Sequence, residues 1–212
     1  MDKQIAFLGT PDFATPILKS IHEHGYKISC VFSQPPKKSK RGYKINKSPV
    51  HLLSEQLGIN IKTPHKIEEE FEYLKSLNLD LAIVVAYGQI LSKDILKLSR
   101  NGFINIHASL LPKWRGAAPI QRSLINMDKI TGISIMKINQ NLDEGPVCNK
   151  YPLEILENEN AKNLSDRLSK LSAEKILENI DKIFNQKVTF EEQDNFAASY
   201  AKKIQKKEGK IN

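Results

Sequence analysis

Several common sequence features are missing from this 212-residue chain, and each absence excludes a class of protein. Its two cysteines, Cys30 and Cys148, stand far apart with no CxxC pair, which excludes a disulfide framework and a cysteine zinc site. No apolar run approaches the roughly 18 to 20 residues that span a bilayer, and the first residues lack the order of a signal peptide. We therefore expect a cytoplasmic protein with no membrane association and no metal.

Two phosphate-binding motifs are absent as well. The first predicted strand-to-helix turn is Gly9-Thr-Pro-Asp-Phe-Ala14, which lacks the glycines of GxGxxG, and the chain contains no GxxxxGK[ST]. Dinucleotide binding and nucleoside triphosphate hydrolysis are therefore not supported.

Positive charge is concentrated in two segments. The chain has 32 basic and 24 acidic side chains, a net charge of +8, and it is otherwise of ordinary globular composition, with 40% hydrophobic residues. Residues 33–50 hold six bases and no acid, and residues 202–210 hold five bases and one acid. A polyanionic partner would explain both segments, and solvated surface lysine is the alternative.

The order of apolar segments predicts the fold class. Runs rich in β-branched residues alternate with helical patterns, which indicates an α/β protein with a Rossmann-like, open, mostly parallel sheet and helices on both faces. Strands are predicted over 4–9, 27–33, 59–61, 80–87, 103–107, 132–138 and 147–156. Helices are predicted over 12–24, 48–57, 67–77, 116–126 and 163–184. Pro35, Pro36 and the basic run that follows them are expected to be a loop, 188–190 a short strand, and the basic tail unpacked.

The densest group of polar residues begins inside the strand predicted at 103–107. Asn105 and His107 lie on one face of it, two residues apart, at its carboxyl end. The strand predicted at 132–138 leads to Asp143, which we expect at the same edge of the sheet. Asn can donate to an oxyanion, His can stabilise it or move a proton, and Asp can orient His, so the three suit acyl transfer.

Other interpretations of these residues have less support. Asn105 and His107 could be satisfied structural side chains. Ser109 lacks the strained GxSxG turn of a serine nucleophile, and no His/carboxylate cluster suggests a metal. The remaining histidines are scattered, and we expect all four at the surface: His22, His24, His51 and His65.

Five segments resemble the formyltransferases that use 10-formyltetrahydrofolate, in particular the methionyl-tRNA formyltransferases. The Asn105–Gln121 segment contains the HxSLLPxxRG pattern of that family. The other matching segments are 7–14, 34–42, 85–91 and 143–145. The likeness runs over roughly residues 4–205. It implies a formyltransferase fold and transfer of the formyl group to the α-amine of methionyl initiator tRNA, with Asn105, His107 and Asp143 as the catalytic residues.

The resemblance also implies binding residues. The folate cosubstrate would lie against the loop that carries Asp143 and against two further segments: Ser109, Leu110, Leu111 and Pro112, and the backbone of Ala86, Tyr87, Gly88, Gln89, Ile90 and Leu91. The tRNA would contact the basic loop through Lys37, Lys38, Lys40, Arg41 and Lys44.

Family members usually carry a further C-terminal domain. We expect a catalytic domain over 1–190, a basic tail or linker over 191–212, and a monomer. Formylation of a sugar amine and a non-catalytic RNA-binding module remain alternative functions.

Overall fold

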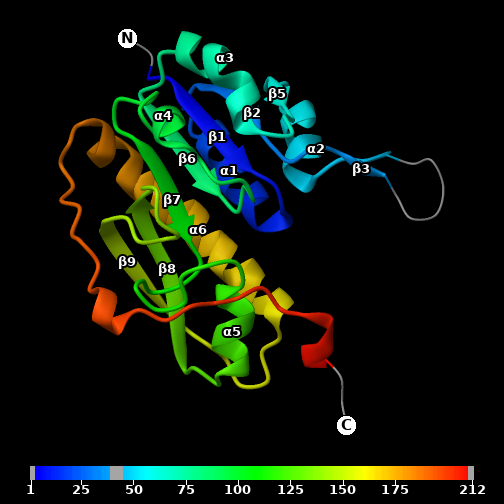
Figure 1. Cartoon of the computed structure of the whole chain (residues 1–212), viewed down its shortest axis with the longest axis vertical. Coiled ribbons are helices and arrows are strands. Elements are labelled where there is room, and N and C mark those ends of the chain that lie inside the picture. The colour runs from blue at the N-terminus through cyan, green and yellow to red at the C-terminus, as the bar shows by residue number, and fades with distance from the viewer. Residues whose placement is uncertain (1–2, 39–44, 210–212) are drawn as a thin grey trace.

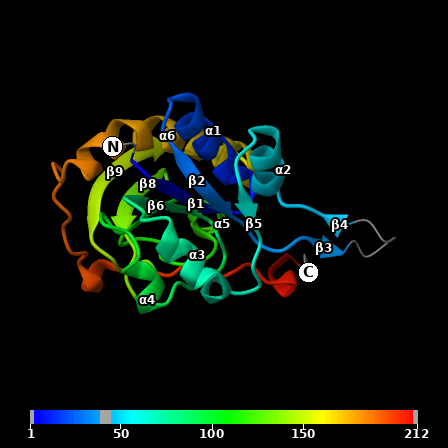
Figure 2. The same ribbon diagram turned by 90° about the horizontal axis from the view of Figure 1, so that it is seen from above.

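The protein is a seven-stranded sheet covered on both faces (Figure 1, Figure 2). The computed structural model describes residues 3–38 and 45–209. The strands are β1 (Ile5–Gly9), β2 (Ile28–Phe32), β5 (Ile61–Lys62), β6 (Leu81–Val85), β7 (Phe103–His107), β8 (Ile130–Lys137) and β9 (Val147–Glu154). They lie in the order β5-β2-β1-β6-β7-β8-β9; the first five are parallel, and β8 and β9 are antiparallel to their neighbours. The predicted α/β class and mostly parallel sheet are confirmed.

One face of the sheet carries the main hydrophobic core. Helix α1 (Thr15–Glu23) and the long helix α6 (Ala161–Phe184) pack there against side chains such as Ile104 and Ile106. Buried positions of α6 recur every three or four residues, including Leu164, Leu168, Ile176 and Ile180, so the helix presents one apolar stripe. Each such fully buried side chain contributes about 1.5–3 kcal/mol. Side chains at 104 and 106 face this layer, so those at 103, 105 and 107 face the other.

The opposite face is covered unequally. Helices α3 (Phe71–Ser76) and α4 (Lys93–Leu96) belong to a second core over β1 and β6. Over β7 and β8 the cover is made of loops, with a small third core of Leu111, Met136 and Val147 beneath them. The candidate site is built in this loop-covered part.

The remaining helices are short. They are α2 (Pro49–Gln56), α5 (Pro119–Ile125) and the 3-10 turns η1 (Asp12–Ala14), η2 (Ile67–Glu70), η3 (Asn195–Ala197) and η4 (Lys206–Gly209). Ser48 caps α2 by accepting a hydrogen bond from the backbone N–H of His51, as expected of serine before a helix. His51 is 9% exposed, so the prediction that all four scattered histidines lie at the surface is wrong for this one.

Three local expectations were wrong. The basic run after Pro35 and Pro36, predicted as a loop, contains a short antiparallel strand pair, β3 (Lys37–Lys38) with β4 (Ile45–Asn46), which lies beside α2 (Figure 1). Residues 188–190 form no strand. The tail is not unpacked, because Ala201 exchanges backbone hydrogen bonds with Arg115 and Ala118. The predicted domain division at residue 190 stays a prediction, but the chain beyond it adheres to the sheet domain.

Candidate active site

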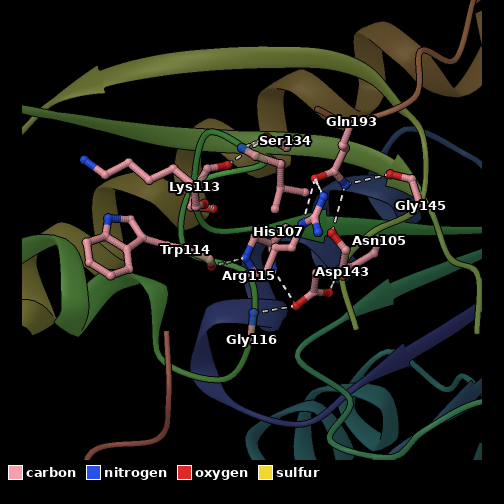
Figure 3. A network of polar contacts seen from close by, with 12 residues as sticks. Asn105, His107, Lys113, Trp114, Arg115, Gly116, Ser134, Asp143, Gly145 and Gln193 are labelled. Atoms are coloured by element: carbon pink, nitrogen blue, oxygen red, sulfur yellow. Dashed lines mark hydrogen bonds and ion pairs between the residues drawn. The ribbon is translucent and has the colours of Figure 1, made fainter. Parts of the chain in front are cut away.

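Asn105, His107 and Asp143 meet on the loop-covered face (Figure 3). Asn105 Nδ2 donates to Asp143 Oδ1 at 3.3 Å, and His107 Nδ1 lies 3.7 Å from Asp143 Oδ2. The backbone N–H of Gly116 donates to Asp143 Oδ2 at 2.8 Å, which fixes the carboxylate. The His107 side chain is 7% exposed and that of Asp143 is 16% exposed, so this group is largely shielded from water.

The neighbours of His107 indicate which of its ring nitrogens carries hydrogen. His107 Nε2 lies 2.8 Å from the carbonyl oxygen of Trp114. A carbonyl oxygen can only accept, so we infer that Nε2 carries hydrogen and donates. Nδ1 is then the nitrogen that faces Asp143. A proton on Nδ1 would produce an imidazolium beside a carboxylate, which is a favourable pair.

Asp143 reaches the site by a route that differs from the expected one. Because β8 is antiparallel to β7, with Ile104 opposite Lys137 and His107 opposite Ser134, the carboxyl end of β8 lies beside the start of β7. The prediction that the loop after this strand begins at the same sheet edge is therefore wrong. The loop instead turns back over β7 before β9 begins, and this return brings Asp143 to Asn105.

The loop after β7 is held by hydrogen bonds within it and to residues at and before β8. Ser109 is fully buried, its hydroxyl donates to the carbonyl of Lys113, and its carbonyl accepts from Ser134. The peptide bond between Leu111 and Pro112 is cis. A second anchor is Asp128, which accepts hydrogen bonds from Lys113 and from the indole of Trp114. These contacts set the position of the Trp114 carbonyl that binds His107.

The residues predicted to bind folate differ in exposure and fall into three groups. Ala86, Gly88 and Ile90 are exposed in the segment that follows β6. The strand β6 itself pairs with β7, which carries Asn105 and His107. Tyr87, Leu91, Ser109 and Leu111 are buried, so their side chains pack in the core or within the loop after β7. Leu110, Pro112 and Gln89 are half-buried. Burial raises the pKa of Tyr87 above its usual value, with acidic residues of η2 adding to the effect.

The side chain of Gln89 is used in hydrogen bonds within the protein: it accepts from the N–H of Ile67 and donates to the carbonyl of Pro64. Two other polar side chains, Thr10 and Gln34, donate to the carbonyl of Tyr87 and hold the same segment. The exposed backbone at 86 and 88 has positive φ, 47° and 83°.

Most of the predicted tRNA-binding residues cannot be placed. Lys40, Arg41 and Lys44 lie outside the described residues. Lys37 is exposed on β3, and the backbone of Lys38 belongs to the same strand. Within the described residues, no group of three or more His, Cys, Asp or Glu side chains is arranged to hold a metal ion. In that part of the chain no helix is long and apolar enough to cross a membrane.

Two residues beside the site were not predicted. Arg115 is buried, with its side chain 0% exposed, and it binds Gln193 from the segment after α6. Arg115 lies inside the HxSLLPxxRG pattern, so its neighbourhood could have suggested a role. Gln193 lies in a polar segment with no apolar periodicity, and nothing local in the sequence marks it.

Comparison with known proteins places the chain in a family. Residues 3–180 match the family model described as formyl transferase. The chain belongs to this family. It is similar to the methionyl-tRNA formyltransferase of Pelagibacter ubique, with 58% identity over all of this chain and 69% of that protein. The chain is therefore a formyltransferase, an enzyme of group transfer.

Solved structures agree on the fold. The phosphoribosylglycinamide formyltransferase from Anaplasma phagocytophilum superposes with a TM-score of 0.74 at 21% identity, covering 89% of this chain and 90% of that one. An N-formyltransferase from Helicobacter canadensis, solved with folinic acid and dTDP-3-aminofucose, gives 0.73 at 22% identity, covering 95% and 71%. Identity this low supports the shared fold alone.

Proposed function

We propose that the chain transfers the formyl group of 10-formyltetrahydrofolate to the α-amine of methionyl initiator tRNA, as a cytoplasmic monomer. The observation that carries the proposal is the convergence of Asn105, His107 and Asp143 on one shielded face, in a chain 58% identical throughout to a methionyl-tRNA formyltransferase. The residues up to about 190 form its catalytic domain.

In the proposed reaction the amine nitrogen attacks the formyl carbon and produces a tetrahedral oxyanion. Collapse breaks the bond to folate N10, which takes up a proton as the amine loses one. Asn105 uses one amide N–H on Asp143 and has a second N–H to donate to the oxyanion. His107 donates from protonated Nδ1, and the Asp143 carboxylate stabilises that positive charge.

The folate would lie along the exposed segment after β6. Ala86 and Gly88 present their backbone there, and Ile90, with 88% of its surface exposed, is an apolar side chain that a flat ring could cover. Leu110 and Pro112 would supply the opposite wall. The formyl donor, 10-formyltetrahydrofolate, suits this arrangement, because its pterin ring needs apolar contact and a few hydrogen bonds to the backbone.

The acceptor end of the tRNA would bind the basic segment that follows Pro36. Lys37, Lys38, Lys40, Arg41 and Lys44 would contact phosphates, and such contacts weaken steeply with salt. Arg41→Ala should raise the KM for methionyl initiator tRNA and leave the KM for folate unchanged. Lys187→Ala, a lysine exposed after α6, is the matched control. An equal loss of folate affinity in Arg41→Ala would contradict this assignment.

Formyl transfer by the purified chain tests the function. Methionyl initiator tRNA, free methionine and an amino-sugar nucleotide would be compared as acceptors at equal concentration. The proposal expects transfer to the charged tRNA at the highest kcat/KM. Preferred transfer to the amino sugar, or folate binding without transfer to any tRNA, would refute it.

A further inference from the structure

Gln193 lies beyond the residues that match the family model, yet it contacts the loop that carries Asp143. The family match ends at residue 180. After α6 the chain returns past β9 toward α5 (orange to red in Figure 1). On this return Gln193 Nε2 donates to the carbonyl oxygens of Asp143 at 2.8 Å and Gly145 at 2.7 Å. One side chain therefore spans both ends of the Asp143-Glu144-Gly145 turn (Figure 3).

The orientation of this amide is dictated by Arg115. Its Nε and Nη2 donate to Gln193 Oε1 at 3.1 and 2.9 Å. Arginine has donors only, so the amide oxygen must face it and the amide nitrogen must face the two carbonyls. Both N–H groups of Gln193 and its oxygen are thereby used. Arg115 is itself held by Asn195 at 2.8 Å and by an ion pair with Glu144 at 3.3 Å.

The turn needs such support because its backbone is strained. Asp143 has a φ of 52°, in the left-handed region where a residue other than glycine costs about 1–3 kcal/mol and persists only when its surroundings enforce it. The carboxylate is fixed by Asn105 and by the N–H of Gly116, while the backbone behind it is fixed by Gln193. Loss of the Gln193 contacts would free the backbone to relax and move the carboxylate.

We propose that Gln193 is a positioning residue for formyl transfer: oriented by Arg115, it holds the turn that sets the Asp143 carboxylate against Asn105 and His107. This inference rests on the proposed role of Asp143. It adds a residue of the segment after α6 to those that serve the reaction, and it makes the buried Arg115 the residue that orients Gln193.

Gln193→Glu tests the proposal with little change in shape. The introduced carboxylate keeps its acceptor for Arg115 but has no donor for the two carbonyls, and it repels them. Displacement of a reacting group by about 1 Å costs on the order of 10²-fold in rate. We expect kcat to fall about 10- to 100-fold with the KM for folate changed less than about threefold. Glu192→Gln, the reverse change at the exposed neighbour, is the matched control and should keep full kcat.

A double-mutant cycle separates positioning from a general structural role. If Gln193 acts through Asp143, then Gln193→Glu should lower single-turnover rates much less in an Asp143→Asn background than in the wild-type background, because coupled residues are not additive. Equal losses in both backgrounds, or an unchanged kcat in Gln193→Glu, would overturn the inference. If Asp143→Asn alone keeps full activity, the proposed function of the site fails instead, so the two failures are distinguishable.

A readout that needs no activity completes the test. The side-chain amide of Asn105 donates to Asp143, so its ¹H–¹⁵N signal reports the position of the carboxylate. Gln193→Glu should shift this signal while thermal unfolding stays cooperative, and Glu192→Gln should not shift it. An unmoved Asn105 signal in folded Gln193→Glu would contradict the proposal.

Discussion

Replacement of Asp143 by asparagine removes one charge at an almost constant shape. At 3.7 Å the carboxylate and an imidazolium attract each other by about 4 kcal/mol for an effective dielectric constant near 20. The carboxylate also accepts from Asn105 and from the N–H of Gly116. An amide at position 143 can keep one of these bonds through its oxygen, and its nitrogen then faces a donor. Asn105 must turn over, which misdirects the N–H intended for the oxyanion.

The lost charge of Asp143 and the misdirected N–H of Asn105 both weaken binding of the transition state. We therefore expect kcat to fall about 10²- to 10³-fold, which corresponds to a barrier raised by about 3–4 kcal/mol. Steady-state transfer assays with saturating folate and tRNA measure this. Asp80→Asn is the matched control, because Asp80 is also buried and accepts from a backbone N–H, that of Gln4, and from Arg100. It should cost stability and leave kcat near the wild-type value. A kcat within threefold of wild type in Asp143→Asn would refute the reasoning.

Three further predictions concern groups around the site and in the core. Burial acts to raise the pKa of Asp128, but hydrogen bonds from Lys113, Trp114 and Asn126 outweigh it and lower that pKa. The folded state therefore gains stability from Asp128 above its unfolded pKa of about 3.9 and loses it as pH falls through the lower folded value. Urea unfolding between pH 3 and 6 should show a shallower acid loss in Asp128→Asn than in wild type, and parallel curves would contradict this. Gly145→Ala should lower kcat more than about tenfold, because a Cβ there would collide with the carbonyl oxygen of Lys137 and the turn must move; Gly58→Ala, whose Cβ would meet nothing within 4 Å and whose φ of 67° disfavours alanine, should cost stability but keep its kcat. Burial raises the pKa of both Cys30 and Cys148 to about 11, so a disulfide reagent at pH 8 should label the native protein slowly and the unfolded protein at once, and immediate labelling of two thiols in the native state would show the burial to be wrong.

The parallel half of the sheet could be predicted because its information is local. The segment at 80–87 is apolar with β-branched residues, which is typical of a strand buried on both faces, and β6 has all five residues buried. The strand at 103–107 was predicted with its observed bounds. Alternation along this strand also placed Asn105 and His107 on one face, which the structure confirms.

The direction of β8 could not be predicted in the same way. Its apolar residues suit a parallel or an antiparallel neighbour equally, and the choice depends on pairing with β7 and β9. The prediction that Asp143 joins the other two residues therefore reached the observed contact through a wrong path. The strand pair of β3 and β4 was missed for a related reason, since strands of two residues are too short to show alternation.

Gln193 shows the limit of the sequence more clearly. Its segment is polar and has no periodicity, and its partners are separated from it by 48 to 78 positions. Its importance lies in its side-chain amide, which accepts hydrogen bonds from one buried arginine and donates to two backbone carbonyls. Such a role becomes visible only when distant segments are brought together in space.

The hydrogen bonds of Asp143 divide between its side chain and its backbone, and this division makes chemistry and position separable. The side chain is bound by Asn105 and Gly116, whereas the carbonyl is bound by Gln193. Asp143→Asn removes the charge and leaves the contact between Gln193 and the backbone in place. Gln193→Glu keeps the charge and releases the backbone. If the site works as proposed, both variants lose rate. Gln193→Glu should also shift the Asn105 amide signal although Asp143, the partner of that amide, is unchanged; in Asp143→Asn the partner itself is replaced.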